Sequence, residues 1–235
     1  MLHVYKAGRK TPGGTQVRFT LLDGSEVTTS VHTLLNAGYA GRSQDDVAAH
    51  VRELAELGVP APSVTPALYP VAPYLAQQTE TVPAQHGRTS GEAEWALVIT
   101  EEGVLLTAAC DHTDRELEVH GVAWSKNADP DVLSRRAWRL DDITDLDAVR
   151  LQSWVDGVPV QDGTLAELLP PSYWLPVLQE RGLATPGTAL LSGTLPMDPA
   201  VDQFGESWRV AMTDPANGNV LELTYTVAPL PEPIG

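Results

Sequence analysis

Apolar and polar residues alternate along several short segments of this chain, and a period of two residues predicts strands with one buried face. Val17, Phe19 and Leu21 form the first such set, and glycine-containing turn signals flank them on both sides. A lone hairpin is only marginally stable in water. We therefore expect residues 1–33 to form a β hairpin or small meander that packs on a main domain spanning residues 34–235.

A helical period replaces the strand period over residues 43–58. Val47, Val51 and Leu54 recur at spacings that place them on one face of a helix, and Gly58 is a typical stop signal. This pattern predicts a helix that buries one apolar face.

Most of the remaining chain predicts strands. Nineteen glycines and nineteen prolines indicate many turns, and the proline-rich residues 59–88 indicate an extended segment that wraps the core. The other predicted elements are a strand starting near Glu92, a second strand at 104–110, a strand–turn–strand at 151–160, a helix at 172–181, and strands at 188–192, 208–212 and 220–227. The predicted fold class is therefore mostly β with a few helices (α+β).

The charge of the chain limits its partners. Fifteen basic and 31 acidic residues give a formal net charge of −16, so we expect neither nucleic acid nor an anionic membrane as a partner. The N-terminus lacks the apolar core of a signal peptide, and no apolar run approaches the roughly 18 residues that cross a bilayer. Cys110 is the only cysteine, which excludes an internal disulfide and fits a reducing compartment. We expect a cytoplasmic protein.

Two carboxylates stand at the head of an apolar strand. Glu92 and Glu94 are two residues apart, so they share one face, which continues into the apolar Ala96 and Val98. Two like charges that enter a core are costly unless a positive charge neutralises them. A divalent cation is the simplest candidate for that charge.

A third carboxylate and a lysine follow on neighbouring elements. The predicted strand at 104–110 delivers Asp111 at its end, and Lys126 follows a short helical segment. Asp114 is the alternative to Asp111 as the third acid. Three carboxylates and a lysine on converging elements predict a metal site with an electrostatic partner.

The predicted helix carries a second candidate pair. His50 and Glu53 are three residues apart, so they are neighbours on the helix surface at the edge of its apolar face. Their spacing fits a solvated pair at a helix edge. It equally fits a general base and its orienting acid above a pocket.

Six short patterns occur in a fixed order along the chain. They are H-x-x-E at His50 and Glu53, E-x-E at Glu92 and Glu94, an aspartate at Asp111 in DHTDR, a lysine at Lys126 in WSK, the hairpin VDGVPVQDG, and GTALLSGTLP from Gly187 to Pro196. In this order the patterns resemble the fumarylacetoacetate hydrolase family, and more closely an uncharacterised prokaryotic branch of it, DUF2848. The resemblance runs from about Leu34 to the C-terminus.

The resemblance implies a mixed β-roll and a metal-dependent hydrolase that cleaves a carbon–carbon bond in a small 1,3-dioxo or 2-oxo acid. Glu92, Glu94 and Asp111 would hold Mg²⁺ or Mn²⁺, since carboxylate ligation suits hard cations. His50, oriented by Glu53, would activate water. The other implied residues are Lys126, which would balance the oxyanion's charge, and Arg42, Gly193 and Thr194, which would bind the substrate.

Several alternatives stay open. The same site could support a 2-oxo acid decarboxylase or an enol/keto isomerase. A relative that binds a small molecule without catalysis, or a cysteine hydrolase that uses Cys110, would belong to a different functional class. Family members are typically dimers, so the resemblance also implies a homodimer with a small carboxylic acid as its substrate.

Overall fold

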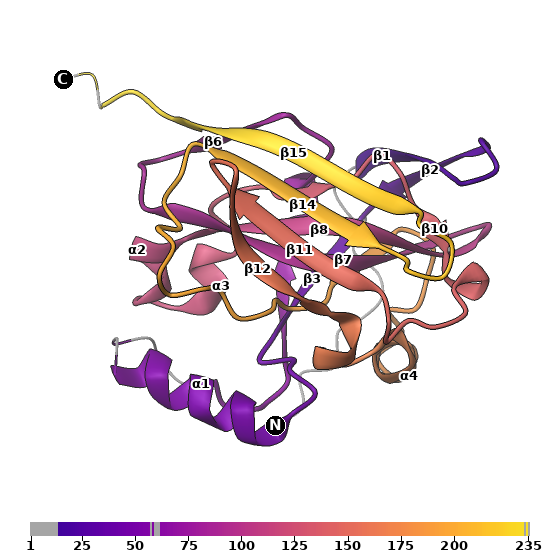
Figure 1. The fold of residues 1–235 in the computed structure, drawn as a ribbon, viewed down its shortest axis with the longest axis horizontal. Helices are drawn as coiled ribbons and strands as arrows, with labels where there is room; N and C mark the ends of the chain where they lie inside the picture. The colour runs from indigo at the N-terminus through magenta and orange to yellow at the C-terminus, as the bar shows by residue number, and fades with distance from the viewer. Residues whose placement is uncertain (1–13, 57, 59–61, 233, 235) are drawn as a thin grey trace.

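The structure is a computed structural model that describes residues 14–56, 58, 62–232 and 234 (Figure 1). Residues 1–13 of the predicted hairpin segment lie outside the described part. The predicted mostly-β class is confirmed. The strands are β1 (Thr15–Thr20), β2 (Glu26–Val31), β3 (Thr33–Gly38), β4 (Ala67–Val71), β5 (Ala76–Gln77), β6 (Thr81–Ala84), β7 (Thr89–Thr100), β8 (Gly103–Asp114), β9 (Asp131–Leu133), β10 (Trp138–Arg139), β11 (Arg150–Val155), β12 (Val158–Thr164), β13 (Thr188–Leu191), β14 (Ser207–Thr213) and β15 (Val220–Pro229). The helices are α1 (Gln44–Glu56), α2 (Arg115–Glu118), α3 (Val122–Ser125) and α4 (Pro171–Glu180).

An eight-stranded sheet forms the centre of the fold, in the order β4-β3-β13-β7-β8-β9-β5, with β10 also paired to β8. This sheet curls on itself. Asn36 on β3 donates a hydrogen bond of 3.1 Å to Asp131 on β9, although β13, β7 and β8 lie between these two strands in the sheet order. Four strand spacings of about 4.8 Å would separate them in a flat sheet, so only a roll brings them together.

A five-stranded sheet, in the order β12-β11-β14-β15-β6, covers one face of the roll. Figure 1 shows β15, β14 and β11 in front of β8 and β7. The main core lies between the two sheets. Its largest buried side chains include Trp95 from β7 and Trp208 from β14. Alternation along β7 aims its odd-numbered residues, such as Trp95 and Leu97, at this core.

The even-numbered residues of β7 face a second core on the inside of the roll. Ala96 and Val98 pack there with Phe19 and Val27 from the hairpin β1–β2. The hairpin pairs antiparallel from Thr15–Val31 to Thr20–Glu26 and closes this core. Because Glu92 and Glu94 have the same parity as Ala96, their side chains point to the inside of the roll.

One sequence prediction near these strands was too short, and two short strands were not predicted. The second strand extends to Asp114, so Asp111 lies inside β8 and not at its end. The sequence predicted no element over residues 127–147, but this segment contributes β9 and β10. β9 pairs antiparallel with β8, with Asp131 opposite Asp111. Short strands such as these carry little periodicity, so tertiary pairing decides whether they form.

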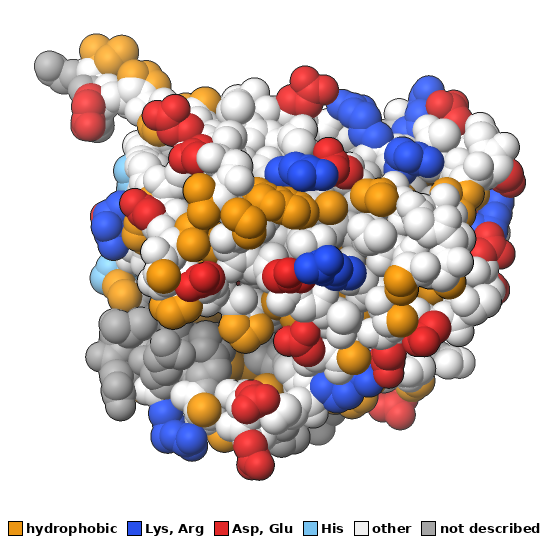
Figure 2. All heavy atoms as spheres, in the orientation of Figure 1, with side chains coloured by type: hydrophobic (Ala, Val, Ile, Leu, Met, Phe, Trp, Pro, Cys, Tyr) orange, Lys and Arg blue, Asp and Glu red, His pale blue; other side chains and the backbone are white. Residues whose placement is uncertain are grey.

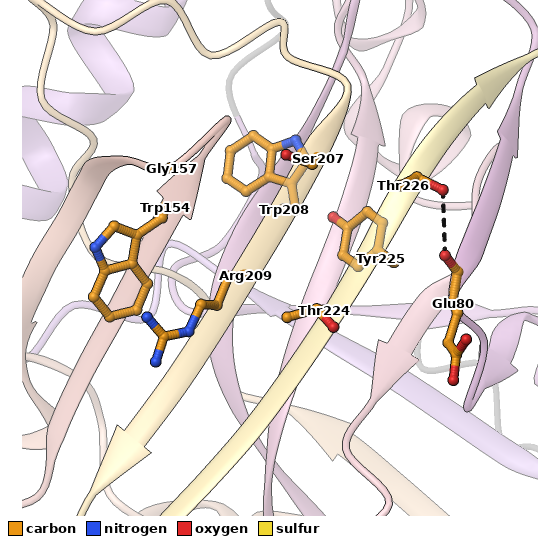
Figure 3. Close-up of a pocket in the computed structure, with 9 residues that line it drawn as sticks. All are labelled: Glu80, Trp154, Gly157, Ser207, Trp208, Arg209, Thr224, Tyr225 and Thr226. Carbon is orange, nitrogen blue, oxygen red and sulfur yellow. Dashed lines mark hydrogen bonds between the residues drawn. The ribbon is translucent and has the colours of Figure 1, made fainter.

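The outer face of the five-stranded sheet is open to solvent, and Figure 2 shows apolar side chains in a row across it beside basic and acidic ones. Trp154 on β11 and Arg209 on β14 lie side by side (Figure 3), with the guanidinium 4.4 Å from the indole centroid. Arg209 also pairs with Glu222 on β15. Trp154 and Arg209 line a hollow of about 560 Å³ on this face. Among the described residues, no helix has the length and apolarity needed to cross a membrane.

Candidate metal centre

Strand register brings three carboxylates together. β7 and β8 pair antiparallel with Glu92 directly opposite Asp111. Glu94 follows Glu92 by two residues on β7, so it lies on the same face of the strand. One carboxylate oxygen from each of these three residues lies within 4.8 Å of the other two. Asp111 and Glu94 are fully buried, and the Glu92 side chain is only 14% exposed.

Two cations neutralise part of this charge. Lys126, at the C-terminal end of α3, pairs with Asp111 Oδ2 and lies with its Nζ 3.3 Å from Glu92 Oε2. Arg115, the first residue of α2, donates to Glu92 Oε1 at 2.8 Å. The Asp114 carboxylate caps α2 by accepting from two of its backbone N–H groups. The cap fixes the start of helix α2 at Arg115, whose side chain then reaches Glu92 on β7.

The surroundings of Glu92 and Glu94 shift their pKa values in opposite directions. Burial raises the pKa of Glu92, but Lys126 and Arg115 outweigh it and hold that pKa at about 2. Burial also raises the pKa of Glu94, and the nearby Asp111 and Glu92 add to the effect, so this pKa lies well above its usual range. Burial opposes the charge on Lys126, yet the surrounding carboxylates raise its pKa well above the ordinary value. Lys126 is therefore an ammonium at neutral pH.

Glu94 has one oxygen ready for a ligand. Its Oε2 accepts a hydrogen bond of 2.7 Å from the Gly193 backbone N–H, whereas its buried Oε1 has no hydrogen-bond partner among the described residues. An unpartnered buried carboxylate oxygen is costly. An all-oxygen set of this kind fits a hard divalent cation such as Mg²⁺ or Mn²⁺.

A further acid, which the sequence analysis missed, adjoins the three. Asp131 on β9 lies opposite Asp111 on β8 and is fully buried. Its Oδ1 accepts a hydrogen bond from Asn36, and its Oδ2 has no hydrogen-bond partner in the part of the chain that the structure describes. Burial, followed by the charge of Asp111, raises the pKa of Asp131 well above its usual value. The only signal for this residue was its position before the apolar pair Val132-Leu133.

The sequence matches the family described as "Protein of unknown function (DUF2848)" over residues 37–225. The chain belongs to this family. No curated protein matches it.

Solved structures of a hydrolase, an isomerase and a dehydratase have the same fold. A fumarylpyruvate hydrolase from Pseudomonas aeruginosa, in complex with Mn²⁺ and pyruvate, superposes with a TM-score of 0.63 at 18% identity, covering 95% of this chain and 100% of that one. A 5-carboxymethyl-2-hydroxymuconate delta-isomerase from Mycobacterium smegmatis gives 0.60 at 18%, covering 92% and 99%. A 2-keto-3-deoxyarabinonate dehydratase gives 0.59 at 16%, covering 88% and 78%. At these identities the likeness shows the fold.

In this DUF2848 chain, Asp114 serves a different purpose from Asp111. Asp114 Oδ1 accepts from the backbone N–H groups of Glu116 and Leu117, and its Oδ2 lies 3.2 Å from His86 Nε2. The oxygens that cluster with Glu92 and Glu94 belong to Asp111. The geometry thus favours Asp111 over Asp114 as the third ligand.

The two residues that flank Asp111 on β8, Cys110 and His112, face the other side of the strand. His112 contacts Tyr225 Oη at 2.9 Å and Thr89 Oγ1 at 2.8 Å, and burial lowers its pKa to about 3. Cys110 lies 3.2 Å from the same Tyr225 hydroxyl, and burial raises the pKa of its thiol. A buried thiol with a raised pKa is a poor nucleophile, which argues against a cysteine hydrolase.

The remaining predicted residues lie on separate elements. Gly193 contacts Glu94, and Thr194 Oγ1 donates to the Ala93 carbonyl at 2.9 Å. Arg42 forms a two-point ion pair with Asp147 at 2.7 and 2.8 Å, and no described hydrogen bond or ion pair joins it to the carboxylates. His50 and Glu53 lie on α1, as predicted. Their side chains lie outside the described residues.

Proposed function

We propose that this protein is a Mg²⁺- or Mn²⁺-dependent enzyme that cleaves a carbon–carbon bond in a small 1,3-dioxo or 2-oxo acid. The observation that carries the proposal is the buried cluster of Glu92, Glu94 and Asp111 with an unpartnered oxygen on Glu94. The fold it shares with a hydrolase crystallised with Mn²⁺ and pyruvate supports the same assignment. When bound, the ion would polarise the substrate carbonyl and stabilise the enolate that remains after cleavage.

Lys126 supplies a fixed positive charge in this scheme. It stays protonated at neutral pH because carboxylates surround it, so it donates hydrogen bonds and cannot act as a base. Its contacts with Asp111 and Glu92 support a role for the ammonium beside the proposed ion site. There it would stabilise an oxyanion on the substrate.

The family resemblance supplies the other roles. His50, oriented by Glu53, would take the proton from the attacking water, a contribution worth roughly 10²–10⁴-fold in rate. Gly193 holds Glu94 in place through its N–H, and with Thr194 and Arg42 it would bind the substrate. A homodimer remains a prediction from the same resemblance.

The ion site is tested by thermal melting of the wild type with and without MnCl₂. The ion stabilises only the folded chain, by about 2.7 kcal/mol at a hundred times the dissociation constant, so the melting temperature should rise. A Glu92→Ala/Glu94→Ala variant should lose this rise. The matched control is Glu101→Ala/Glu102→Ala, which removes two exposed glutamates at the turn of the same β7–β8 hairpin. An equal Mn²⁺ response in both variants would disprove the site.

The reaction is tested by turnover of a panel of 2-oxo and 1,3-dioxo acids with Mn²⁺ present. A hydrolase yields two fragments, one of which carries ¹⁸O from labelled water. An isomerase, the activity of one structural relative, yields one product of unchanged mass, and a decarboxylase releases CO₂. His50→Ala should abolish hydrolysis while the Mn²⁺ shift in melting temperature persists. Metal binding without turnover of any compound would favour a non-catalytic relative.

A further inference from the structure

A cavity lies between α2, the segment after α3 and the strand β6. It is separate from both the carboxylate cluster and the hollow on the five-stranded sheet. Its volume is about 470 Å³, within the range of small-molecule sites. Neither Lys nor Arg is among its lining residues, which are Pro83, Gln85, His86, Asp114, Glu116, Leu117, His120, Ala128, Asp129 and Leu230. We call it the Asp129 cavity.

Asp129 is the acid of this cavity that has no partner. It is only 3% exposed, its Oδ2 is buried without a hydrogen bond, and no described side chain or backbone group pairs with either oxygen. The other acids of the cavity are engaged. Asp114 caps α2 and contacts His86, and the exposed Glu116 lies 3.5 Å from Arg88. A buried carboxyl without a donor points to a ligand that supplies one.

His86, one of the two histidines that line the cavity, contacts Asp114 through a hydrogen bond. His86 Nδ1 accepts from the Arg88 backbone N–H at 3.1 Å, so the ring carries its proton on Nε2 when neutral and can donate that proton to Asp114. No positive charge is needed for either contact. The cavity is thus an acidic site with a free acceptor, opposite in charge to a site for a carboxylic acid.

We infer that the Asp129 cavity binds a small organic cation, a primary ammonium on a short aliphatic chain. The ammonium would donate to Asp129, and the apolar Pro83, Leu117 and Leu230 would contact the carbon chain. A bare metal ion fits less well. Among the described residues, only Glu92, Glu94 and Asp111 bring three ligand atoms close enough to share an ion.

The cavity and the metal centre use the same segment of chain. Asp114 lines the cavity, and the next residue, Arg115, pairs with Glu92. Asp129 follows Lys126 by three residues. None of the three clustered carboxylates lines the cavity, so the two sites can be tested independently.

The test is thermal melting and calorimetric titration of the full chain with n-butylammonium chloride. The controls are 1-butanol, an uncharged molecule of similar shape, and NaCl at matched ionic strength. Butylammonium should raise the melting temperature to a plateau, whereas neither control should. Asp129→Asn should weaken binding on the order of tenfold or more, the effect of losing a hydrogen bond to a charged group.

Two further variants keep the result decisive. Ala128→Phe fills the cavity from an exposed position and should also weaken binding, even if Asp129→Asn fails to fold. Glu92→Ala/Glu94→Ala should bind butylammonium like the wild type, and Asp129→Asn should keep its Mn²⁺ response. An absent plateau, an equal effect of 1-butanol, or wild-type binding by the Asp129 and Ala128 variants would overturn the inference.

Discussion

Lys126→Met is the substitution that probes the metal centre most directly. The lysine side chain is 7% exposed and pairs with both Asp111 and Glu92. Methionine keeps most of its length and removes the charged ammonium together with its hydrogen bonds. Glu92 retains Arg115 as a partner, whereas Asp111, which is fully buried, loses the only cation that pairs with it among the described residues.

The expected loss of stability follows from this imbalance. Removing one member of a buried ion pair costs about 3–5 kcal/mol, because it leaves a buried charge without compensation. For a chain of this size, each 1 kcal/mol lowers the melting temperature by about 2–4 °C. We therefore expect Lys126→Met to melt about 6–20 °C below the wild type in EDTA.

Manganese should reverse much of this loss. In the wild type, an arriving cation must compete with Lys126 for Asp111, but in the variant that carboxylate is free. The stabilisation by MnCl₂ should thus be larger in Lys126→Met than in the wild type. Urea unfolding in EDTA measures the loss of stability, and its repetition with MnCl₂ measures the stabilisation by the ion. Arg18→Met is the matched control, because its ion pair with Glu26 is exposed and contributes about 1 kcal/mol or less.

Two results would refute this reasoning. Wild-type stability of Lys126→Met in EDTA would mean that the lysine does not compensate the buried carboxylates. A smaller Mn²⁺ stabilisation in the variant would mean that the ion binds elsewhere.

Two further predictions concern Glu94. Its folded pKa lies well above the ordinary 4.5, so the metal-free folded chain holds a proton that the unfolded chain releases; this contribution to stability therefore falls as pH rises from about 4.5 through the folded pKa. Mn²⁺ should release that proton, so its affinity should rise with pH over the same window. Calorimetry in two buffers of different ionisation enthalpy detects the proton release, and Glu94→Gln should abolish it. A wild type that releases no proton on binding Mn²⁺ would contradict the assignment. Gly193→Ala should cost about 1–3 kcal/mol and weaken the Mn²⁺ response, because the glycine has φ +85° and a Cβ would lie 3.1 Å from the Ala37 carbonyl oxygen. Gly24→Ala is the control, because Gly24 has φ +82° but open space around it, so its unfolding free energy reports backbone strain alone. Equal losses of unfolding free energy in the two variants would show that crowding near Glu94 is unimportant.

Alternation along the chain was sufficient to predict how the two glutamates point. Glu92 and Glu94 share parity with Ala96 and Val98, and a strand has only two faces, so burial of the apolar pair determines the face of the acids. The same local rule predicted the hairpin β1–β2 and, with a period of 3.6, the helix α1. These features depend on neighbours in sequence, which is why periodicity reveals them.

Register and curvature decided the rest of the site. Glu92 meets Asp111 only because β7 and β8 pair in one register, and a shift of one residue would turn Asp111 to the opposite face. Asp131 joins them because β9, a strand too short to show a period, pairs with β8, and because the sheet rolls until Asn36 reaches it.

The sequence by itself determined the strand pattern, the acidic charge and the face on which Glu92 and Glu94 lie. The tertiary structure alone decided that Arg115 and Asp131 join these charges, since both come from segments whose approach no local pattern encodes. It also left Asp129 buried beside a cavity, with no hydrogen-bond partner among the residues that the structure describes. The physical reason is that propensity and alternation act between near neighbours, whereas the energy of a buried charge depends on every group that the fold places around it.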